Sequence, residues 1–329
     1  MSIIWCGGED MDFWGGANYP YISTDSKDRR TSYSRCSLYG DNLFCLTYPF
    51  SEVNDVWISS QVFLYNGTNS YHDALIFGLA DSNNDATFNG FGVRKTDGKM
   101  VLRKCVSGTW STLATEAGTS MAFGSVKKID LYLKYAEEGI FRGYINRQLI
   151  VEYTGDLRIT DCSGFKHLFL CSSTYSNYVQ SSEFIVADED TRSLNVKTLV
   201  PNAVGDVNDW NGSYTDIDEI DLSASDYIDS NIPNNVFTSN LTGLPTSSDW
   251  LVKAVRMSAR TKGASSGQDT GVQIGIKTNN AFHYGNTIES SEWKTEEIIY
   301  NENPETLNNF TSEEIDDLQF AAKIIDVSE

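Results

Sequence analysis

Apolar and polar side chains alternate with a period of two over many short stretches of this chain. Within residues 128–135, for example, Ile129, Leu131 and Leu133 share one side of an extended backbone and are separated by other residues. This period is typical of β-strands, whose successive side chains point to opposite faces of a sheet. No stretch has the apolar spacing of a long helix, so the sequence predicts an all-β protein.

Strand signals recur along the first part of the chain and are separated by turn residues. The clearest pair is 91–95 and 100–105, joined through Asp97-Gly98, a dipeptide that favours a tight hairpin turn. Further strands of this part are expected at 42–46, 55–65, 74–80, 110–115, 128–135, 140–146, 148–153, 167–171 and 184–186. About ten antiparallel strands need two sheets, stacked roughly 10 Å apart, to bury one core.

The pattern changes at the acidic run Asp188-Glu189-Asp190. Adjacent carboxylates repel one another and stay in water, so this run ends the last strand of the first part. We expect two domains here, residues 1–190 and residues 191–329. Because the segment 188–194 is charged, limited proteolysis is expected to cut near it.

The second part reads as a smaller β-sandwich. Its clearest strand is 250–260, which is expected to pair with 271–277, and a last strand is expected at 318–325. Before that last strand, Thr311-Ser312-Glu313-Glu314 has a capping residue followed by acids, which predicts one short helix.

Residues around this junction carry a family resemblance. "SSEFIVADEDTRSL", continued by "VKTLVPNAVGDVNDWNG", resembles a family of structural proteins of tailed bacteriophages. The resemblance implies that the first domain is a concanavalin A-like or laminin G-like jelly roll of the lectin type. It implies a place in a virion, and it carries no catalytic signature.

Charge narrows the choice of partners. The chain has 45 acidic and 25 basic residues, with a formal net charge of −20. A surface this acidic repels phosphate, so a nucleic-acid partner is not expected. The excess acid has two interpretations, either solvated loops or attraction for divalent cations or a basic protein partner.

Neither a secretory signal nor a membrane span is evident in the sequence. We therefore expect assembly in the bacterial cytoplasm, without membrane insertion, and location in the virion. Six cysteines are present, at positions 6, 36, 45, 105, 162 and 171. Buried free thiols and disulfides formed between subunits after release are both open interpretations.

Two candidate cation sites can be named from residue types. Asp81, Asn83 and Asp85 place oxygen ligands at alternate positions, which suits calcium, although Ala86 stands where an EF-hand has glycine. The alternative is a plain turn rich in Asp and Asn. A second acidic group has the same two interpretations and consists of Asp206, Asp209, Asp216, Asp218 and Asp221.

Aromatic side chains in expected loops suggest glycan binding. Tyr71, Tyr175 and Tyr178 are the candidates, because most other large aromatic residues are needed in the core. No nucleophile elbow and no phosphate-binding loop is present, and no pair of carboxylates is singled out for catalysis. No catalytic residue and no cofactor is predicted.

The expected function is that of a non-enzymatic bacteriophage virion protein. The favoured version is an accessory component of the head or tail, such as a decoration, spike or fibre-type protein. It would bind other virion proteins, form a homo-oligomer and present the lectin-like domain outward. The alternative is a receptor-binding tail protein that adsorbs to a host surface polysaccharide, and a polysaccharide depolymerase is a less favoured third possibility.

Overall fold

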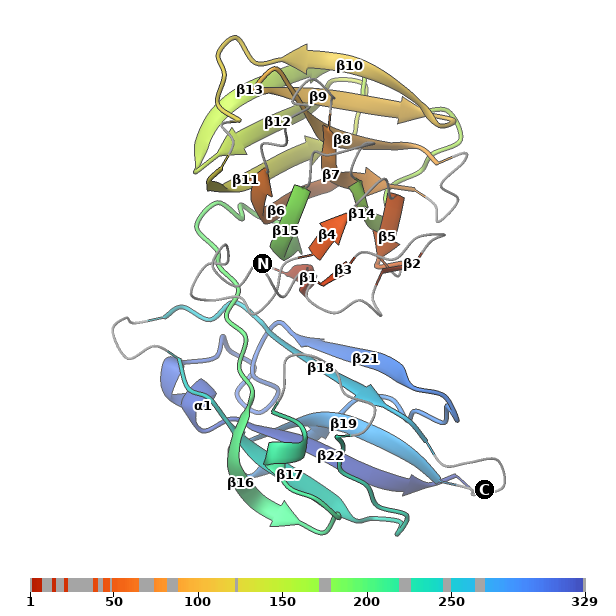
Figure 1. Cartoon of the computed structure of the whole chain (residues 1–329), viewed down its shortest axis with the longest axis vertical. Coiled ribbons are helices and arrows are strands. Elements are labelled where there is room, and N and C mark those ends of the chain that lie inside the picture. Colours follow the sequence, from red (N-terminus) through yellow and green to blue (C-terminus); the bar gives the residue numbers. More distant parts are fainter. Residues whose placement is uncertain are drawn as a thin grey trace. The chain divides into compact units, whose positions relative to one another are not determined.

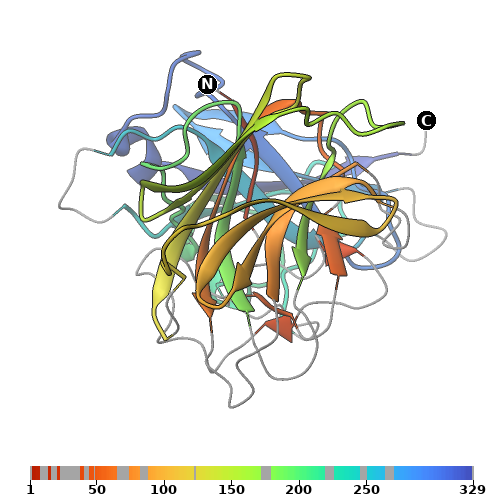
Figure 2. The ribbon, with the colours of Figure 1, turned by 90° about the horizontal axis from the view of Figure 1, so that it is seen from above.

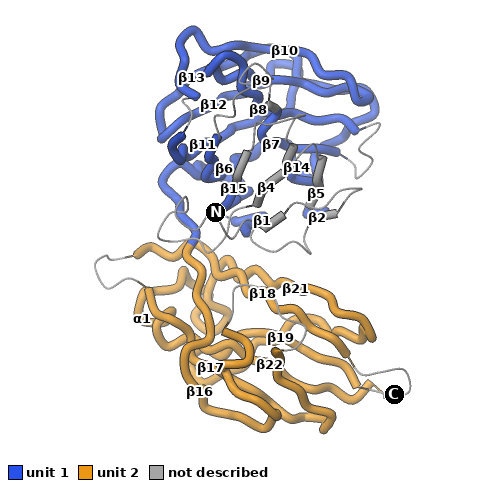
Figure 3. Tube along the Cα trace, in the orientation of Figure 1, with its two compact units in different colours: residues 1–196 blue, residues 197–329 orange. Residues whose placement is uncertain are grey.

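A computed structural model gives the fold of the chain (Figure 1). It describes residues 2–7, 14–15, 21–22, 38–40, 44–47, 49–64, 74–81, 88–121, 124–171, 179–218, 226–244, 250–263 and 270–327. The chain divides into two compact units, residues 1–196 and residues 197–329 (Figure 3). This division lies at 196/197, whereas the sequence placed a boundary at 190/191.

Unit 1 is built from two antiparallel sheets, which we name sheet A and sheet B (Figure 2). Among the described residues, sheet A has the order β13-β12-β11-β6-β15-β4-β3, and β1 also pairs with β15. Its strands are β1 (Ile3–Gly7), β3 (Tyr21–Ile22), β4 (Leu38–Gly40), β6 (Asp55–Leu64), β11 (Val126–Lys134), β12 (Gly139–Ile145), β13 (Gln148–Gly155) and β15 (Val179–Ala187).

Sheet B has the order β10-β9-β8-β7-β14-β5-β2 in the described part of the chain. Its strands are β2 (Trp14–Gly15), β5 (Phe44–Thr47), β7 (Ala74–Ala80), β8 (Gly90–Thr96), β9 (Lys99–Val106), β10 (Thr109–Thr115) and β14 (His167–Cys171). The β8–β9 hairpin turns at Asp97 and Gly98, which have φ values of 48° and 75°. The hairpin predicted from Asp-Gly is therefore confirmed.

The core of unit 1 lies between the two sheets. Alternate residues of facing strands fill it, so that Ile58 and Leu131 from sheet A join Phe91 and Leu102 from sheet B. Phe91 packs edge-on against Phe141 and Phe165, with ring centroids 5.6 and 5.5 Å away. One cluster thus holds both sheets together, as a β-sandwich requires.

Unit 2 pairs a larger sheet with a small one. The larger has the order β16-β17-β22-β19-β20 and the smaller consists of β18 and β21 in the part of the chain that the structure describes. The strands are β16 (Pro201–Asn208), β17 (Val236–Leu241), β18 (Val255–Thr261), β19 (Thr270–Thr278), β20 (Ala281–Tyr284), β21 (Lys294–Tyr300) and β22 (Gln319–Asp326). Met257 of the small sheet packs with Ile274, Ile276 and Ile324 of the larger one. The prediction of an all-β protein with a second, smaller sandwich is confirmed.

Two expectations within unit 2 had different outcomes. Helix α1 (Ser312–Asp316) begins after Thr311, whose side chain accepts a hydrogen bond from Glu314 N, so the predicted short helix is confirmed. The predicted pairing of 250–260 with 271–277 is wrong. Strand β18 pairs with β21, whereas β19 pairs with β22 and β20. The pairing puts β18 in the opposite sheet from β19, so that Met257 can cover the apolar face of β19.

Candidate functional site

Most of the site residues proposed from the sequence lie outside the described residues. This holds for Tyr71, Tyr175 and Tyr178, the glycan-binding candidates, and for Asn83 and Asp85 of the calcium candidate. Asp81 is described and directly follows β7. Its carboxylate accepts hydrogen bonds from Asn89 N at 2.8 Å and from Asn89 Nδ2 at 3.0 Å.

These contacts give Asp81 a structural role, because they join the two ends of the segment between β7 and β8. Within the described residues, no group of three or more His, Cys, Asp or Glu side chains is arranged to hold a metal ion. In the second acidic group, Asp206 pairs with Lys277, and the side chain of Asp216 caps a short 3-10 helix by accepting from Ser213 N at 2.7 Å. These two acids therefore have protein partners.

A different candidate site emerges from the composition of sheet B. None of its seven described strands contains Asp or Glu. Strands β8 and β9 together carry five basic residues, which are Arg94, Lys95, Lys99, Arg103 and Lys104. In a chain with a net charge of −20, the strands of this sheet carry a net positive charge. Two carboxylates flank them, since Asp97 lies in the β8–β9 turn and Glu116, directly after β10, accepts a hydrogen bond from Met100 N at 2.9 Å.

The strand register decides which of these cations face away from the core. Val93 lies opposite Leu102, and both side chains are fully buried between the sheets. Their neighbours Arg94 and Arg103 therefore project from the outer face of sheet B. Lys99 lies opposite Thr96, two residues beyond Arg94, and shares that face.

The three outward cations occupy successive positions along the β8–β9 hairpin. Each step of two residues along a strand is about 7 Å. Arg103, Arg94 and Lys99 thus form a row that rises along the hairpin, which we name the cation row. Arg94 Nε donates to Thr96 Oγ1 at 3.0 Å, and Arg103 Nη2 donates to the Trp110 carbonyl at 3.0 Å, so both guanidinium groups are oriented by their neighbours.

An aromatic cluster lies beside the cation row on the same face. Phe169 of β14 packs with Phe88 and Trp110, with ring centroids 6.0 and 5.7 Å away. Its ring lies over Gly78 and Gly92, where an added Cβ would come within 2.7 and 2.6 Å of it. The glycines of β7 and β8 therefore make room for this ring, and a larger residue at either position would displace it.

Trp110 is also in contact with a cation. The guanidinium carbon of Arg103 is 5.7 Å from the centroid of the Trp110 ring. Such a cation over an aromatic face is attracted by the ring quadrupole. The indole therefore positions Arg103 and is not itself a free stacking surface for a sugar.

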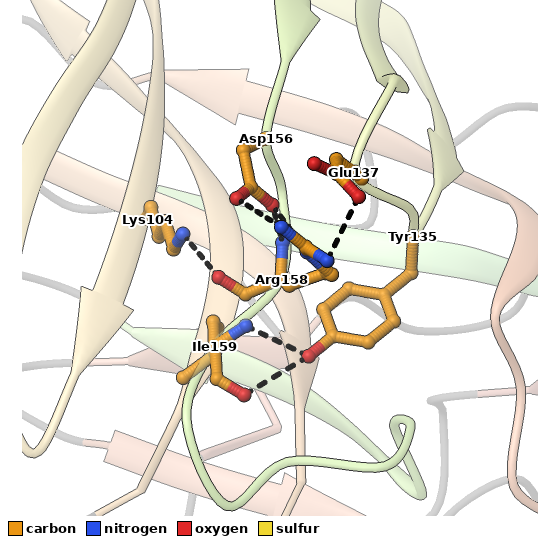
Figure 4. A network of polar contacts seen from close by, with 6 residues as sticks. All are labelled: Lys104, Tyr135, Glu137, Asp156, Arg158 and Ile159. Atoms are coloured by element: carbon orange, nitrogen blue, oxygen red, sulfur yellow. Dashed lines mark hydrogen bonds and ion pairs between the residues drawn. The ribbon is translucent and has the colours of Figure 1, made fainter.

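The connection that leads into β14 is fixed by a polar network (Figure 4). Tyr135 Oη accepts a hydrogen bond from Ile159 N at 2.8 Å, and its hydroxyl donates to the Ile159 carbonyl at 3.1 Å. Lys104 Nζ donates to the Arg158 carbonyl at 2.6 Å. Three separate hydrogen bonds thus tie residues 158–159 to β9 and to the end of β11.

Two acidic residues beside this network are paired. Arg158 donates to both carboxylate oxygens of Asp156, at 2.9 and 2.8 Å, and to Glu137 at 3.0 Å (Figure 4). Hydrogen bonds from Arg158 lower the pKa of Asp156 to about 2. These two carboxylates are therefore paired with Arg158, which is solvent-exposed. Neither of them belongs to a strand of sheet B.

The chain was compared with known families, curated proteins and solved structures. No family model matches the sequence, and no curated protein matches it either. Similar solved structures include the alginate lyase Aly36B, at 11% identity and a TM-score of 0.36, over 49% of this chain and 82% of that chain. Another is the carbohydrate binding module CBM66 from Bacillus subtilis, at 15% identity and a TM-score of 0.36, over 54% of this chain and 97% of that one.

An endo-beta-1,4-glucuronan lyase from the fungus Trichoderma reesei is also similar, at 10% identity and a TM-score of 0.42, over 57% of this chain and 96% of that chain. The prediction that the protein is not an enzyme is therefore corrected, because lyases are among the structures that this chain resembles. Missing motifs in the sequence do not exclude a reaction, since one fold hosts both binding and catalysis.

The cation row was missed by reasoning from the sequence, although a signal was present. Residues 98–115 contain no Asp or Glu, which is unusual in a chain with 45 acidic residues. The predicted hairpin already placed 91–95 beside 100–105. What the sequence did not predict was the register of β9 with β10, in which Arg103 lies opposite Thr112 and diagonal to Trp110.

Proposed function

We propose that this protein is a component of a tailed-bacteriophage virion that adsorbs to an anionic polysaccharide through the outer face of sheet B. The observation that carries the proposal is a sheet with no carboxylate on its described strands and three cations in a row along one hairpin. Carboxylate or sulfate groups of a polysaccharide are suitable partners for such cations.

The charge of the rest of the chain makes this face selective. A net charge of −20 repels anions, so an anionic polymer is attracted only where positive charge is concentrated. Densely charged nucleic acid experiences this repulsion more strongly than a polysaccharide with one charge per sugar. This difference favours a glycan as the ligand.

The virion role is supported by the sequence alone, through the resemblance at residues 181–212. In this proposal, unit 1 faces the host polysaccharide and unit 2 binds other virion proteins. Self-association of the chain stays a prediction. Among the described residues, no helix is long and apolar enough to cross a membrane.

Binding to immobilised polygalacturonate, with neutral dextran as the comparison, tests the glycan ligand. The variants are Arg94→Gln and Lys99→Gln, and Lys134→Gln, at the exposed end of β11, is the matched control. Each cation-row variant is expected to weaken binding about two- to fivefold, because an exposed ion pair contributes up to about 1 kcal/mol. Added salt is expected to weaken wild-type binding as well.

Equal binding to dextran and polygalacturonate, or unchanged binding in both cation-row variants, would refute a role for this face. Shortening of the polymer during the assay would show that the face also supports a reaction. Labelling of purified particles with an antibody against unit 2 tests the virion role separately, and particles without the protein would exclude it.

A further inference from the structure

The segment that leaves sheet A folds back over the outer face of that sheet. We name residues 188–194 the strap. Thr191 at its centre is 0% exposed. Lys128 of β11 donates from Nζ to the carbonyls of Thr191 and Arg192, at 3.0 and 3.3 Å, and to that of Leu194. Lys128 therefore binds the backbone of the strap.

Beneath the strap lie three aromatic rings on neighbouring strands. Trp57 of β6 has Tyr132 of β11 at 4.9 Å and Tyr144 of β12 at 5.4 Å between ring centroids. The guanidinium carbon of Arg192 lies 5.4 Å from the Trp57 centroid and 4.8 Å from that of Tyr144. Arg192 thus covers an aromatic surface that would otherwise face solvent.

A buried carboxylate completes this surface. Asp130 is 0% exposed, and its Oδ1 accepts a hydrogen bond from Thr191 Oγ1 at 2.9 Å. Its second oxygen, Oδ2, is buried and has no hydrogen-bond partner among the described residues. Burial raises the pKa of Asp130, while Lys128 and the side-chain hydrogen bonds with Thr191 and Ser59 act in the opposite direction. A buried acceptor without a donor is costly, and a ligand hydroxyl would satisfy it.

We propose that the outer face of sheet A is a second carbohydrate-binding site, for neutral pyranose units, and that the strap occupies it as a built-in ligand. Each contact of the strap has a counterpart in a sugar. A pyranose ring face replaces Arg192 on Trp57 and Tyr144. A sugar hydroxyl replaces that of Thr191 on Asp130, and hydroxyl or ring oxygens replace the three carbonyls that Lys128 binds.

This proposal is independent of the cation row. The two sites lie on opposite outer faces of unit 1 and differ in chemistry, since the strap site contains a carboxylate and aromatic rings. A neutral oligosaccharide therefore reports on the strap site, whereas polygalacturonate reports on sheet B.

The test is a double variant of the full chain, Thr191→Ala with Arg192→Ala, which removes both side chains that fill the site. Calorimetry with maltohexaose and with cellohexaose as probes is expected to show at least about tenfold tighter binding than in the wild type, because the competent state is more populated. Adding Trp57→Ala is expected to abolish that gain. The matched control, Lys134→Ala with Thr154→Ala, changes exposed residues of the same sheet outside the strap.

A folded double variant that binds neither hexasaccharide more tightly than the wild type overturns the proposal, as does a gain that survives Trp57→Ala. If the double variant fails to fold, Arg192→Lys replaces it, because lysine keeps the charge but stacks poorly on aromatic rings. Its binding is expected to increase about threefold, and no increase contradicts the site. Polygalacturonate binding is expected to stay unchanged throughout.

Discussion

Two thiols of unit 1 are held in their protonated form by the residues around them. Burial raises the pKa of Cys105 and that of Cys162 to about 11. Cys105 lies on sheet B beside Phe169, and its Sγ is 3.5 Å from the Phe88 carbonyl. Cys105 and Cys162 form no disulfide within the chain, and Cys36, Cys45 and Cys171 lie outside the described side chains.

These pKa values predict slow alkylation of the native protein. At pH 8 a thiol with a pKa of about 11 has about 100-fold less thiolate than one at the ordinary value of 9.0, and only the thiolate reacts. We therefore expect iodoacetamide to modify Cys105 and Cys162 about 100-fold more slowly in the native chain than in the same chain in urea. Peptide mass spectrometry measures both rates, and equal rates would contradict the burial.

The sequence predicted those structural elements that depend only on residues close together in the chain. The turn at Asp97-Gly98 and the capped start of α1 at Thr311 depend on residues at most a few positions apart, so the sequence predicted both. The pairing of β18 with β21 joins segments that are far apart in the chain, and the sequence pattern assigned β18 a different partner. Strand patterns identify apolar faces, but partners are chosen by which faces close one core.

The strap also shows an interaction between neighbouring residues that responds to pH. Arg192 donates to both oxygens of Asp190, and this hydrogen bonding lowers the pKa of Asp190. Because the folded pKa is below the unfolded one, the stabilisation is fully present above about pH 4 and is lost as pH falls through the folded pKa.

Asp190→Asn therefore should lower the melting temperature at pH 7, and the difference from the wild type should be smaller at pH 3. The loss is expected to stay below about 1 kcal/mol, since the Asp190 side chain is 44% exposed and water screens the pair. Thermal unfolding at both pH values measures it. A difference that grows as the pH falls would mean that the pair does not stabilise the strap.

At the scale of the whole molecule, the chain consists of two units with separate cores, and the strap belongs to the first. The sequence indicated a change of character near residue 190, where the acidic run follows β15. It did not indicate that Thr191 and Arg192 continue into unit 1, because their partners Asp130 and Lys128 lie about sixty residues earlier. The charges of residues 188–194 suggested an exposed linker. In the structure, contacts with sheet A bury Thr191 at the centre of this segment.

A pair of truncations tests where unit 1 ends. The fragment 1–190 lacks Thr191 and Arg192, so it leaves Asp130 without its hydroxyl donor and Lys128 without its carbonyl acceptors. Buried charges that lose their partners cost about 3 kcal/mol or more, so 1–190 is expected to unfold at clearly lower urea concentration than 1–196. Tryptophan fluorescence follows both transitions. Limited proteolysis of the full chain is accordingly expected to cut within 195–200 before it cuts within 188–194. Equal urea midpoints for the two fragments, or first cutting inside the strap, would place the end of unit 1 at residue 190.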